Sequence, residues 1–328
     1  MQLLHVTPAS PEPEAIALAA RVLRSGGLVA FPTETVYGLG ANALDGAAVQ
    51  RIFDAKERPG NNPLIAHVTG VPMALELVAS WPDTAALLAE RFWPGPLTLV
   101  LPKRAVVPDL VTAGLPAVAI RVPSHPVALA LIRAAALPIA APSANRFTEL
   151  SPTTAAHVVS SLGDRVDIIL DGGPTTVGIE STVVDLTGDV PRLLRPGMVT
   201  LAELEHAIGP IASPPAVVGS GPRLSPGMHE RHYAPRARLM LVTPADVERE
   251  SGQPGVEPVG ALVLGELLWP VQHPIRMPRD PVAYASRLYA ALHSLDDLGC
   301  HLILVERPPD AAEWLGVHDR LQRAATPA

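Results

Sequence analysis

Cysteine and lysine are nearly absent from this sequence. Cys300 is the only cysteine among 328 residues, which excludes an intramolecular disulfide and a multi-cysteine metal site. Its apolar neighbours indicate a small buried side chain. Lys56 and Lys103 are the only lysines, so positive charge comes almost entirely from arginine. A lysine inside a polar motif is for that reason worth attention.

Several familiar catalytic signatures are also missing. The sequence has no GxxxxGK[ST] loop and no complete GxGxxG after a strand, so phosphates would have to be bound by side chains. It has no GxSxG, and residues 229–232 (HERH) do not form HExxH. No other group of His, Asp and Glu has the spacing of zinc ligands. We therefore expect no metal ion to be held by the protein's own side chains.

Long apolar runs and excess positive charge are lacking as well. Apolar residues make up 48% of the chain, but no run reaches the roughly 18 residues of a membrane span. The N-terminus lacks the basic start, apolar stretch and cleavage site of an export signal, so we predict a cytoplasmic protein. The net charge of −7 argues against a surface that binds nucleic acid by neutralising phosphates, although a local basic cavity is compatible with it.

Helical and strand-like segments alternate through the first two thirds of the chain. Residues 12–25 have helical apolar spacing and end at Gly26-Gly27, before a strand-like run at 28–31. Further helices are expected at 46–57 and 201–208. Further strands are expected at 64–68, 98–102, 117–122, 138–142, 167–171 and 181–186. This alternation predicts an α/β domain over residues 1–208 with a largely buried mixed sheet.

A segment rich in proline, glycine and serine follows that domain. Residues 209–236 have little periodicity, which is typical of an extended linker. Strand-like runs then occur at 238–242, 260–265 and 301–306, with helical stretches at 281–298 and 311–325. They predict a second, smaller α/β domain over residues 237–328, in agreement with the two domains that the length favours.

Polar residues collect at the ends of two expected elements early in the chain. FPTETVYGLGANA (31–43) places polar side chains after a strand, where ligands of open α/β sheets bind. An ordinary turn closed by its glycines is the alternative. Lys56 and Arg58 end the expected helix at 46–57, before a loop that carries Asn62. Taken alone, this motif could equally serve to cap the helix, because cations at a helix C-terminus interact favourably with its dipole.

Later segments place polar residues in similar positions. APSAN (141–145) follows a buried strand, and GIESTVVDL (178–186) begins the next expected strand with polar residues. Each of these groups alone would suit a turn or a surface ion pair. Four cations nevertheless fall where an expected strand or helix ends, namely Lys56, Arg58, Arg121 and Arg195. That distribution favours a cavity that binds an anion.

Together these motifs resemble those of the threonylcarbamoyl-AMP synthase family, and the resemblance covers nearly the whole chain. The shared segments are FPTETVYGLG, the KxR of Lys56 and Arg58, the SxN of Ser143 and Asn145, SPTTAAHV (151–158), GIESTVVDL, LLRPG (193–197) and SPGMHERHYAP (225–235). The resemblance implies a YrdC-like domain with a twisted mixed sheet around a basic cavity, a linker, and a smaller Rossmann-like α/β domain.

The activity implied by this resemblance is synthesis of L-threonylcarbamoyladenylate and pyrophosphate from L-threonine, bicarbonate or CO2, and ATP, for threonylcarbamoyl-adenosine formation in tRNA. Mg²⁺ would be the cofactor, held by phosphates and water. The product would pass to a tRNA threonylcarbamoyl-transfer complex, and direct tRNA binding would be weak or absent. Two alternatives stay open: carbamoyl or adenylyl transfer to another acceptor by a YrdC-like module, and a non-enzymatic RNA-binding role.

The resemblance also assigns residues to the substrates. Threonine would be bound by Thr35, His67, Arg121, Ala141 and Ser181. ATP would be contacted by Arg58, Asn62, Ala117, Ser143, Ser151, Arg195, His232 and Tyr233. The catalytic group would be Lys56, Arg58, Ser143 and Asn145. The chain departs from the family pattern at His229-Glu230, where a Lys-Tyr pair is usual, at Ala117, where threonine is common, and over residues 147–150.

The chemistry of such a reaction agrees with the absence of a carboxylate cluster. A carbamate is already an anion, so the step needs positioning and neutralisation of phosphate charge rather than a strong base. We also expect Arg231, His232 and Tyr233 to close over the nucleotide as a mobile lid, because proline and glycine on both sides of them can hinge and stiffen a segment. A passive spacer is the alternative.

Overall fold

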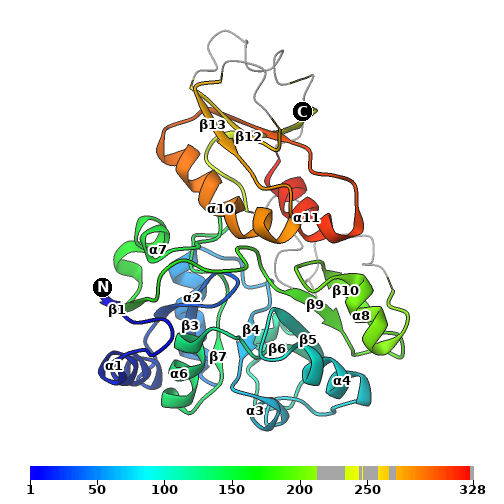
Figure 1. Cartoon of the computed structure of the whole chain (residues 1–328). Helices are drawn as coiled ribbons and strands as arrows, with labels where there is room; N and C mark the ends of the chain where they lie inside the picture. The colour runs from blue at the N-terminus through cyan, green and yellow to red at the C-terminus, as the bar shows by residue number, and fades with distance from the viewer. Residues whose placement is uncertain (213–232, 244–245, 247–257, 266–270, 326–328) are drawn as a thin grey trace.

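Two β-sheets organise the protein. The computed structural model describes residues 1–212, 233–243, 246, 258–265 and 271–325. In that part of the chain, the larger sheet has ten strands and the smaller has four. Figure 1 shows the smaller domain stacked on one side of the larger, with the smaller domain's helices between its sheet and the larger domain. The predicted two-domain α/β fold is confirmed.

Strands and helices alternate along the larger domain. Its strands are β1 (Gln2–His5), β2 (Val29–Pro32), β3 (Tyr37–Asn42), β4 (Ile65–His67), β5 (Leu97–Pro102), β6 (Ala117–Arg121), β7 (Ile139–Ala140), β8 (Ile168–Asp171), β9 (Thr182–Asp185) and β10 (Arg192–Arg195). Its helices are α1 (Pro13–Arg24), α2 (Gly46–Lys56), α3 (Val71–Leu75), α4 (Asp83–Phe92), α5 (Asp109–Thr112), α6 (Pro126–Ala135), α7 (Ala155–Leu162), the 3-10 helix η1 (Gly163–Arg165) and α8 (Leu201–Ile208). Local sequence sets several starts: the Asp45 side chain caps α2, and Thr200 with Glu203 forms a capping box at α8.

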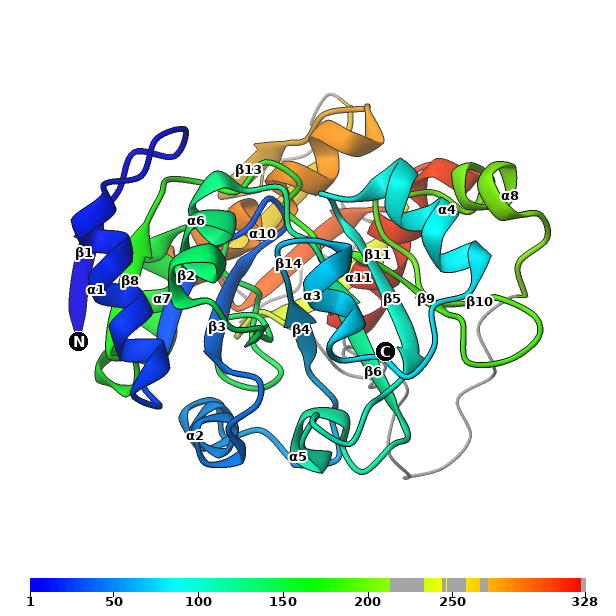
Figure 2. The same ribbon diagram turned by 90° about the horizontal axis from the view of Figure 1, so that it is seen from below.

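The larger sheet is mixed. Its strand order is β1-β8-β2-β3-β7-β4-β6-β5-β9-β10. The β1–β8, β2–β8, β4–β6 and β5–β9 pairs are parallel, and the remaining pairs are antiparallel. Figure 2 shows α1 beside α6 near one edge of the sheet and α4 beside α8 toward the other. The central strands are buried on both faces, as their nearly uninterrupted apolar runs predict.

A β-hairpin in the first motif is a difference from the sequence prediction. Where the glycines of residues 31–43 indicated a loop or turn, β3 pairs antiparallel with β2. Gly40 permits this pairing, because a Cβ atom there would lie 2.7 Å from both Ile139 Cγ2 and Phe31 Cε1. Only residues 33–36 form the turn. Their polar side chains therefore stand at the end of two central strands.

In the described residues, the smaller domain has a parallel sheet with two α-helices on the side that faces the larger domain. Its elements are β11 (Arg238–Val242), β12 (Val259–Val263), β13 (His273–Arg276), α10 (Pro281–Asp297), β14 (Leu302–Glu306), the 3-10 helix η2 (Ala312–Trp314) and α11 (Leu315–Ala324). The strand order is β11-β14-β12-β13, with every pair parallel, which agrees with the predicted Rossmann-like arrangement. The Asp280 side chain accepts from Ala283 N and so caps α10.

Two glycines let the domains approach closely. Gly178 has φ +80°, and a Cβ atom there would lie 2.4 Å from the carbonyl oxygen of Ala285 in α10. At Gly316, a Cβ atom would lie 2.9 Å from the carbonyl oxygen of Gly197. The backbones of the two domains are therefore in direct contact.

Most of the predicted linker, residues 213–232, lies outside the described residues, and the predicted boundaries at 208 and 237 stay predictions. Within the described ranges, none of the helices has the length and apolar composition needed to cross a membrane. The cytoplasmic location also stays a prediction.

Candidate functional site

A cavity opens at the ends of the central strands of the larger sheet. Its lining joins segments that are far apart in the sequence: Thr33, Thr35, Val36, Gly38, Arg58, Ile65, His67, Arg121, Ala141, Pro142, Ser143, Glu180, Ser181, Arg195 and Tyr233. The structure thus brings together all five residues predicted for threonine and four of the residues predicted for ATP, namely Arg58, Ser143, Arg195 and Tyr233.

Arg121 ends β6 and is held in the cavity by two neighbours. Its Nη2 lies 2.6 Å from Glu34 Oε1, and its Nη1 donates to Thr35 Oγ1 at 2.9 Å. The side chains of this ion pair are only 4% and 7% exposed. Burial would raise the pKa of Glu34, but the charge of Arg121 and the hydrogen bonds to the carboxylate together hold that pKa below its usual value. Glu34 is therefore ionised and fixes the orientation of the guanidinium.

His67, at the end of β4, is a neutral hydrogen-bond acceptor in this cavity. Burial, followed by the positive charge of Arg121, lowers the pKa of His67 to about 3. Its Nδ1 lies 3.2 Å from the carbonyl oxygen of Ile65. Because a carbonyl can only accept, Nδ1 carries the proton and Nε2 is the accepting nitrogen.

Ser181 and Arg195 are linked beside the β9–β10 pair. Arg195 donates from Nε to the Ser181 carbonyl oxygen at 3.0 Å and from Nη2 to Ser181 Oγ at 3.1 Å. Thr98 Oγ1 lies 2.8 Å from the same hydroxyl. Two hydrogen-bonded neighbours therefore fix the Ser181 hydroxyl at the cavity wall.

Arg58 supplies another cation to the cavity. Its guanidinium lies over the Phe147 ring at 5.8 Å and donates to the carbonyl oxygen of Pro63. Burial lowers the pKa of Arg58 to about 10, so this side chain stays charged at neutral pH. Together with Arg121 and Arg195 it gives the cavity a positive lining, which favours an anionic ligand.

Lys56 lies behind the cavity wall. It is 1% exposed, and its Nζ donates to the carbonyl oxygen of Ser143 at 2.6 Å and to that of Asn145. Asn145 in turn donates from Nδ2 to the carbonyl oxygens of Arg146 and Glu149. The KxR and SxN segments therefore meet, but Lys56 and Asn145 brace the loop that carries Ser143 and are not part of the cavity lining. Both acceptors of the Lys56 ammonium belong to that loop and not to α2, which does not support the helix-capping interpretation.

The remaining residues predicted for ATP are also outside the lining. Asn62 is fully buried in its loop and donates to Asn61 Oδ1. Ala117 belongs to a small apolar cluster at the start of β6. Ser151 is buried and donates from Oγ to Glu180 Oε1 at 2.5 Å, so it reaches the cavity through a carboxylate. His232 lies outside the described residues, as do His229, Glu230 and Arg231.

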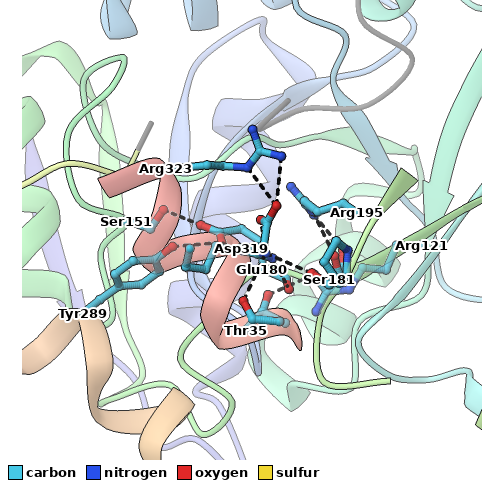
Figure 3. A network of polar contacts seen from close by, with 12 residues as sticks. Thr35, Arg121, Ser151, Glu180, Ser181, Arg195, Tyr289, Asp319 and Arg323 are labelled. Carbon is cyan, nitrogen blue, oxygen red and sulfur yellow. Dashed lines mark hydrogen bonds and ion pairs between the residues drawn. The ribbon is translucent and has the colours of Figure 1, made fainter. Parts of the chain in front are cut away.

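Glu180 is a lining residue that the sequence analysis does not identify. It directly precedes Ser181, and a carboxylate beside the polar start of GIESTVVDL was the available signal. Burial would raise the pKa of Glu180, but the charges of Arg320 and Arg195 hold it below its usual value. Oε2 accepts from Arg320 Nε at 2.7 Å and from the Tyr289 hydroxyl at 3.1 Å. Figure 3 shows Tyr289 and Ser151 pointing toward Glu180. Both donors to Oε2 belong to the smaller domain, which no local pattern around Glu180 indicates.

Carboxylates suited to hold a metal are few in this site. Among the described residues, no group of three His, Cys, Asp or Glu side chains could hold a metal ion. Glu180, the carboxylate in the lining, already accepts from Ser151, Tyr289 and Arg320. A divalent cation here would therefore depend on oxygen ligands brought by the bound molecule or by water.

Both parts of the chain match known families. Residues 21–197 match the family described as "Telomere recombination", and residues 199–326 match "Threonylcarbamoyl-AMP synthase, C-terminal domain". Threonylcarbamoyl-AMP synthase of Pyrococcus abyssi is 45% identical over 320 residues, covering 94% of each chain. The Bacillus subtilis enzyme of the same name is 44% identical over 320 residues, covering 94% of this chain and 92% of the other.

Solved structures show the same similarity. The crystal structure of P. abyssi Sua5 complexed with L-threonine superposes with a TM-score of 0.94 at 42% identity, and the match covers 99% of this chain and 98% of the other. The structure of E. coli YciO gives a TM-score of 0.52 at 27% identity and covers 60% of this chain and 95% of the other. The first of these structures therefore matches both domains in their relative arrangement.

Proposed function

Because the chain belongs to the threonylcarbamoyl-AMP synthase family, we propose that its basic cavity joins L-threonine, bicarbonate or CO2, and ATP into L-threonylcarbamoyl-AMP, with release of pyrophosphate. The chain is an enzyme of tRNA modification that transfers a nucleotidyl group. The observation that carries the proposal is the convergence of Arg58, Arg121 and Arg195 on one cavity. Three buried cations in a site without a carboxylate cluster suit a polyanionic substrate.

The threonine end of the cavity is proposed to lie at Thr35, His67, Arg121 and Ser181. An arginine held in place by a carboxylate suits the carboxylate of an amino acid, because charge-assisted hydrogen bonds to guanidinium are strong and directional. The accepting Nε2 of His67 suits a hydroxyl or amine hydrogen of threonine. The similarity to P. abyssi Sua5, whose solved structure contains L-threonine, supports a threonine site in this fold.

The chemical step follows from the charge of the nucleophile. The amine of threonine forms a bond to CO2 and loses a proton, which gives a carbamate. A carbamate oxygen then forms a bond to the α-phosphorus of ATP, and the bond from that phosphorus to the bridging oxygen breaks as pyrophosphate leaves with the electron pair. Because the nucleophile is already an anion, the protein supplies position and positive charge rather than a base.

The nucleotide end of the cavity is proposed to lie at Arg58, Ser143, Arg195 and Tyr233. The two arginines neutralise charge that develops on phosphate oxygens, and the Ser143 hydroxyl is a further donor to them. Lys56 acts through the SxN loop, which it holds by two hydrogen bonds. The aromatic ring of Tyr233 suits contact with a flat base.

Magnesium is proposed to enter with ATP, held by phosphate oxygens and water. When bound, it neutralises charge on the leaving pyrophosphate. The Glu180 carboxylate is engaged by three donors and so does not serve as its main ligand. The product is proposed to pass to a separate transfer complex that acts on tRNA in the cytoplasm.

Product analysis with labelled bicarbonate tests this function. The purified chain is incubated with ATP, Mg²⁺, L-threonine and ¹³C-bicarbonate, and nucleotides are separated for mass spectrometry. The expected product is threonylcarbamoyl-AMP that carries the ¹³C label. Arg58→Ala is expected to form it at a rate lower by about 10²-fold or more, because one donor to the developing phosphate charge is removed. An adenylate of threonine without the label, or no adenylate at all, would contradict the proposal.

A further inference from the structure

Arg320, on α11 of the smaller domain, is the largest fully buried side chain in the described part of the protein. Its guanidinium crosses the domain boundary with every nitrogen engaged. Nε donates to Glu180 Oε2 at 2.7 Å, Nη2 donates to the Glu180 carbonyl oxygen at 3.0 Å, and Nη1 donates to the Pro196 carbonyl oxygen at 2.9 Å. Figure 3 shows this region, with Glu180 and Ser181 of the larger domain and Asp319 and Arg323 of α11 labelled. A planar guanidinium that donates several directed hydrogen bonds restricts the orientation of its acceptors more than a compact ammonium charge does.

Glu180 connects Arg320 to the cavity. The carboxylate lines the cavity, and its two oxygens face different domains. Oε2 accepts from Arg320 and from the Tyr289 hydroxyl, both in the smaller domain, whereas Oε1 accepts from Ser151 in the larger domain. The Glu180 side chain therefore has one orientation in which all three donors are satisfied. Its backbone leads directly into Ser181.

Tyr233 is held by the same arginine. The Arg320 guanidinium lies 5.5 Å from the centre of the Tyr233 ring, and the Tyr289 ring lies 5.9 Å from it on a tilted plane. Tyr233 has φ +60°, a conformation that residues other than glycine adopt only when surrounding contacts impose it. It is also part of the cavity lining. Contacts from α10 and α11 therefore set the position of an aromatic wall of the site.

The charge of Arg320 matters for a polyphosphate. Burial would lower the pKa of Arg320, but the charges of Glu180 and Asp319 outweigh it and raise that pKa, so the side chain is a permanent cation. Without it, Arg195 would be the remaining cation that offsets the ionised Glu180, and more of that negative charge would act on the cavity. Such a charge repels an anionic nucleotide, most strongly where water is excluded.

We propose that Arg320 is a positioning residue for the nucleotide. Through it, the smaller domain completes the ATP end of the cavity, because Arg320 neutralises and orients Glu180 and holds the Tyr233 ring in place. The inference rests on the proposed function in taking the side of Arg195 and Tyr233 as the ATP end. It gives the smaller domain a role in nucleotide binding.

At the threonine end, Ser181 adjoins this network through the Glu180 backbone, whereas His67 and Arg121 have no hydrogen bond or ion pair with Arg320 among the described residues. We therefore expect threonine binding to change much less than ATP binding.

Equilibrium affinities test this proposal independently of turnover. MgATP and L-threonine are titrated separately, in bicarbonate-free buffer, into the full chain. Arg320→Lys keeps the charge but loses the fork of three directed bonds, and Tyr289→Phe removes one donor to Glu180 with little change in packing. We expect affinity for MgATP to fall about tenfold in Arg320→Lys and by about threefold in Tyr289→Phe, while affinity for threonine stays within about twofold.

Arg236→Ala is the matched control. Arg236 directly precedes the smaller domain, but its side chain is 74% exposed and its ion pairs are with Asp296 and Asp297 at the end of α10. Both affinities should be unchanged in this variant. Equal loss there would mean that any disturbance of the smaller domain has the same effect, and the proposal would be wrong.

Two further outcomes are informative. If Arg320→Lys and Tyr289→Phe bind MgATP as the unchanged chain does and only melt at a lower temperature, Arg320 merely holds the domains together and the proposal is overturned. Steady-state kinetics of the same two variants add a second measurement. A rise in KM for ATP without a rise in KM for threonine supports the positioning role of Arg320. A chain that binds MgATP but forms no threonylcarbamoyl-AMP would contradict the proposed function, yet the comparison of affinities would still decide the role of Arg320.

Discussion

The Nζ of Lys56 lies 2.6 Å from the carbonyl oxygen of Ser143, so the KxR segment holds the backbone of the SxN loop. A second hydrogen bond, to the Asn145 carbonyl oxygen, completes the attachment. Because the lysine is buried, water cannot readily take the place of these two carbonyl acceptors. We therefore expect Lys56 to contribute to the reaction by positioning Ser143.

Substitution of Lys56 by methionine should affect both rate and stability. The apolar side chain fills the same space but leaves two buried carbonyl oxygens unpaired, which costs about 1–3 kcal/mol of unfolding free energy. Displacement of the Ser143 loop should lower turnover by about 10²-fold. Lys103→Met is the control, because Lys103, the only other lysine, bonds Val107 and Asp109 away from the cavity. Near-normal turnover of Lys56→Met with a lower melting temperature would contradict the positioning role.

The buried pair of Arg121 and Glu34 gives a second prediction. Glu34→Gln removes the carboxylate that orients the guanidinium, and breaking a buried ion pair by changing one partner costs about 3–5 kcal/mol. KM for threonine should rise, because Arg121 lies at the proposed threonine end. Glu57→Gln is the matched change in the exposed pair with Arg165, where a loss below about 1 kcal/mol is expected. Denaturant unfolding and steady-state kinetics measure both; equal effects in the two variants would refute the prediction.

Close contact at Gly178 gives a third prediction. A Cβ atom there would meet the backbone of α10 at 2.4 Å, and φ +80° disfavours any other residue. Gly178 N also donates to the Thr35 carbonyl oxygen, so movement at this point reaches the cavity. Gly178→Ala should lower the unfolding free energy by about 1–3 kcal/mol and reduce turnover. Gly188→Ala, at a position with nothing within 4 Å, should do neither, and identical behaviour of the two variants would rule out the close contact.

Stability should depend on pH through stacked histidines at the domain boundary. The rings of His157 and His293 lie 3.8 Å apart, and burial together with the neighbouring ring lowers the pKa of His157 from 6.5 to about 4. The unfolded chain thus binds this proton at a higher pH than the folded chain. The unfolding free energy should be highest above about pH 6.5 and should fall as the pH drops toward about 4.

Substitution of His157 by glutamine tests this dependence. The slope of unfolding free energy against pH, measured by urea unfolding, should be shallower in His157→Gln over that range. It should not vanish, because His67, with a pKa lowered to about 3, acts in the same direction. His206→Gln, at an exposed position on α8, should leave the slope unchanged. An unaltered slope in His157→Gln would exclude the stacked pair as its source.

Local patterns and motifs anticipate much of this structure. The α/β alternation predicts the strands that form the centre of the larger sheet, and the motifs with Thr35, Arg121 and Ser181 identify lining residues, because such residues stand at strand ends. The role of Lys56 was not predictable, since which atoms its ammonium meets depends on how two segments fold together. Likewise nothing near Glu180 in the sequence indicates Arg320, which lies 140 residues away on another domain.

Pyrophosphate release measured with each substrate omitted in turn tests the central claim most directly. The unchanged chain, supplied with Mg²⁺ and ATP, should release pyrophosphate rapidly only when L-threonine and bicarbonate are both present. Valine in place of threonine should support release poorly, by a factor of up to about 10⁴, because a site built to hydrogen-bond a hydroxyl rejects an analogue that lacks one. Release that needs neither threonine nor bicarbonate, or that valine supports as well as threonine does, would contradict the account.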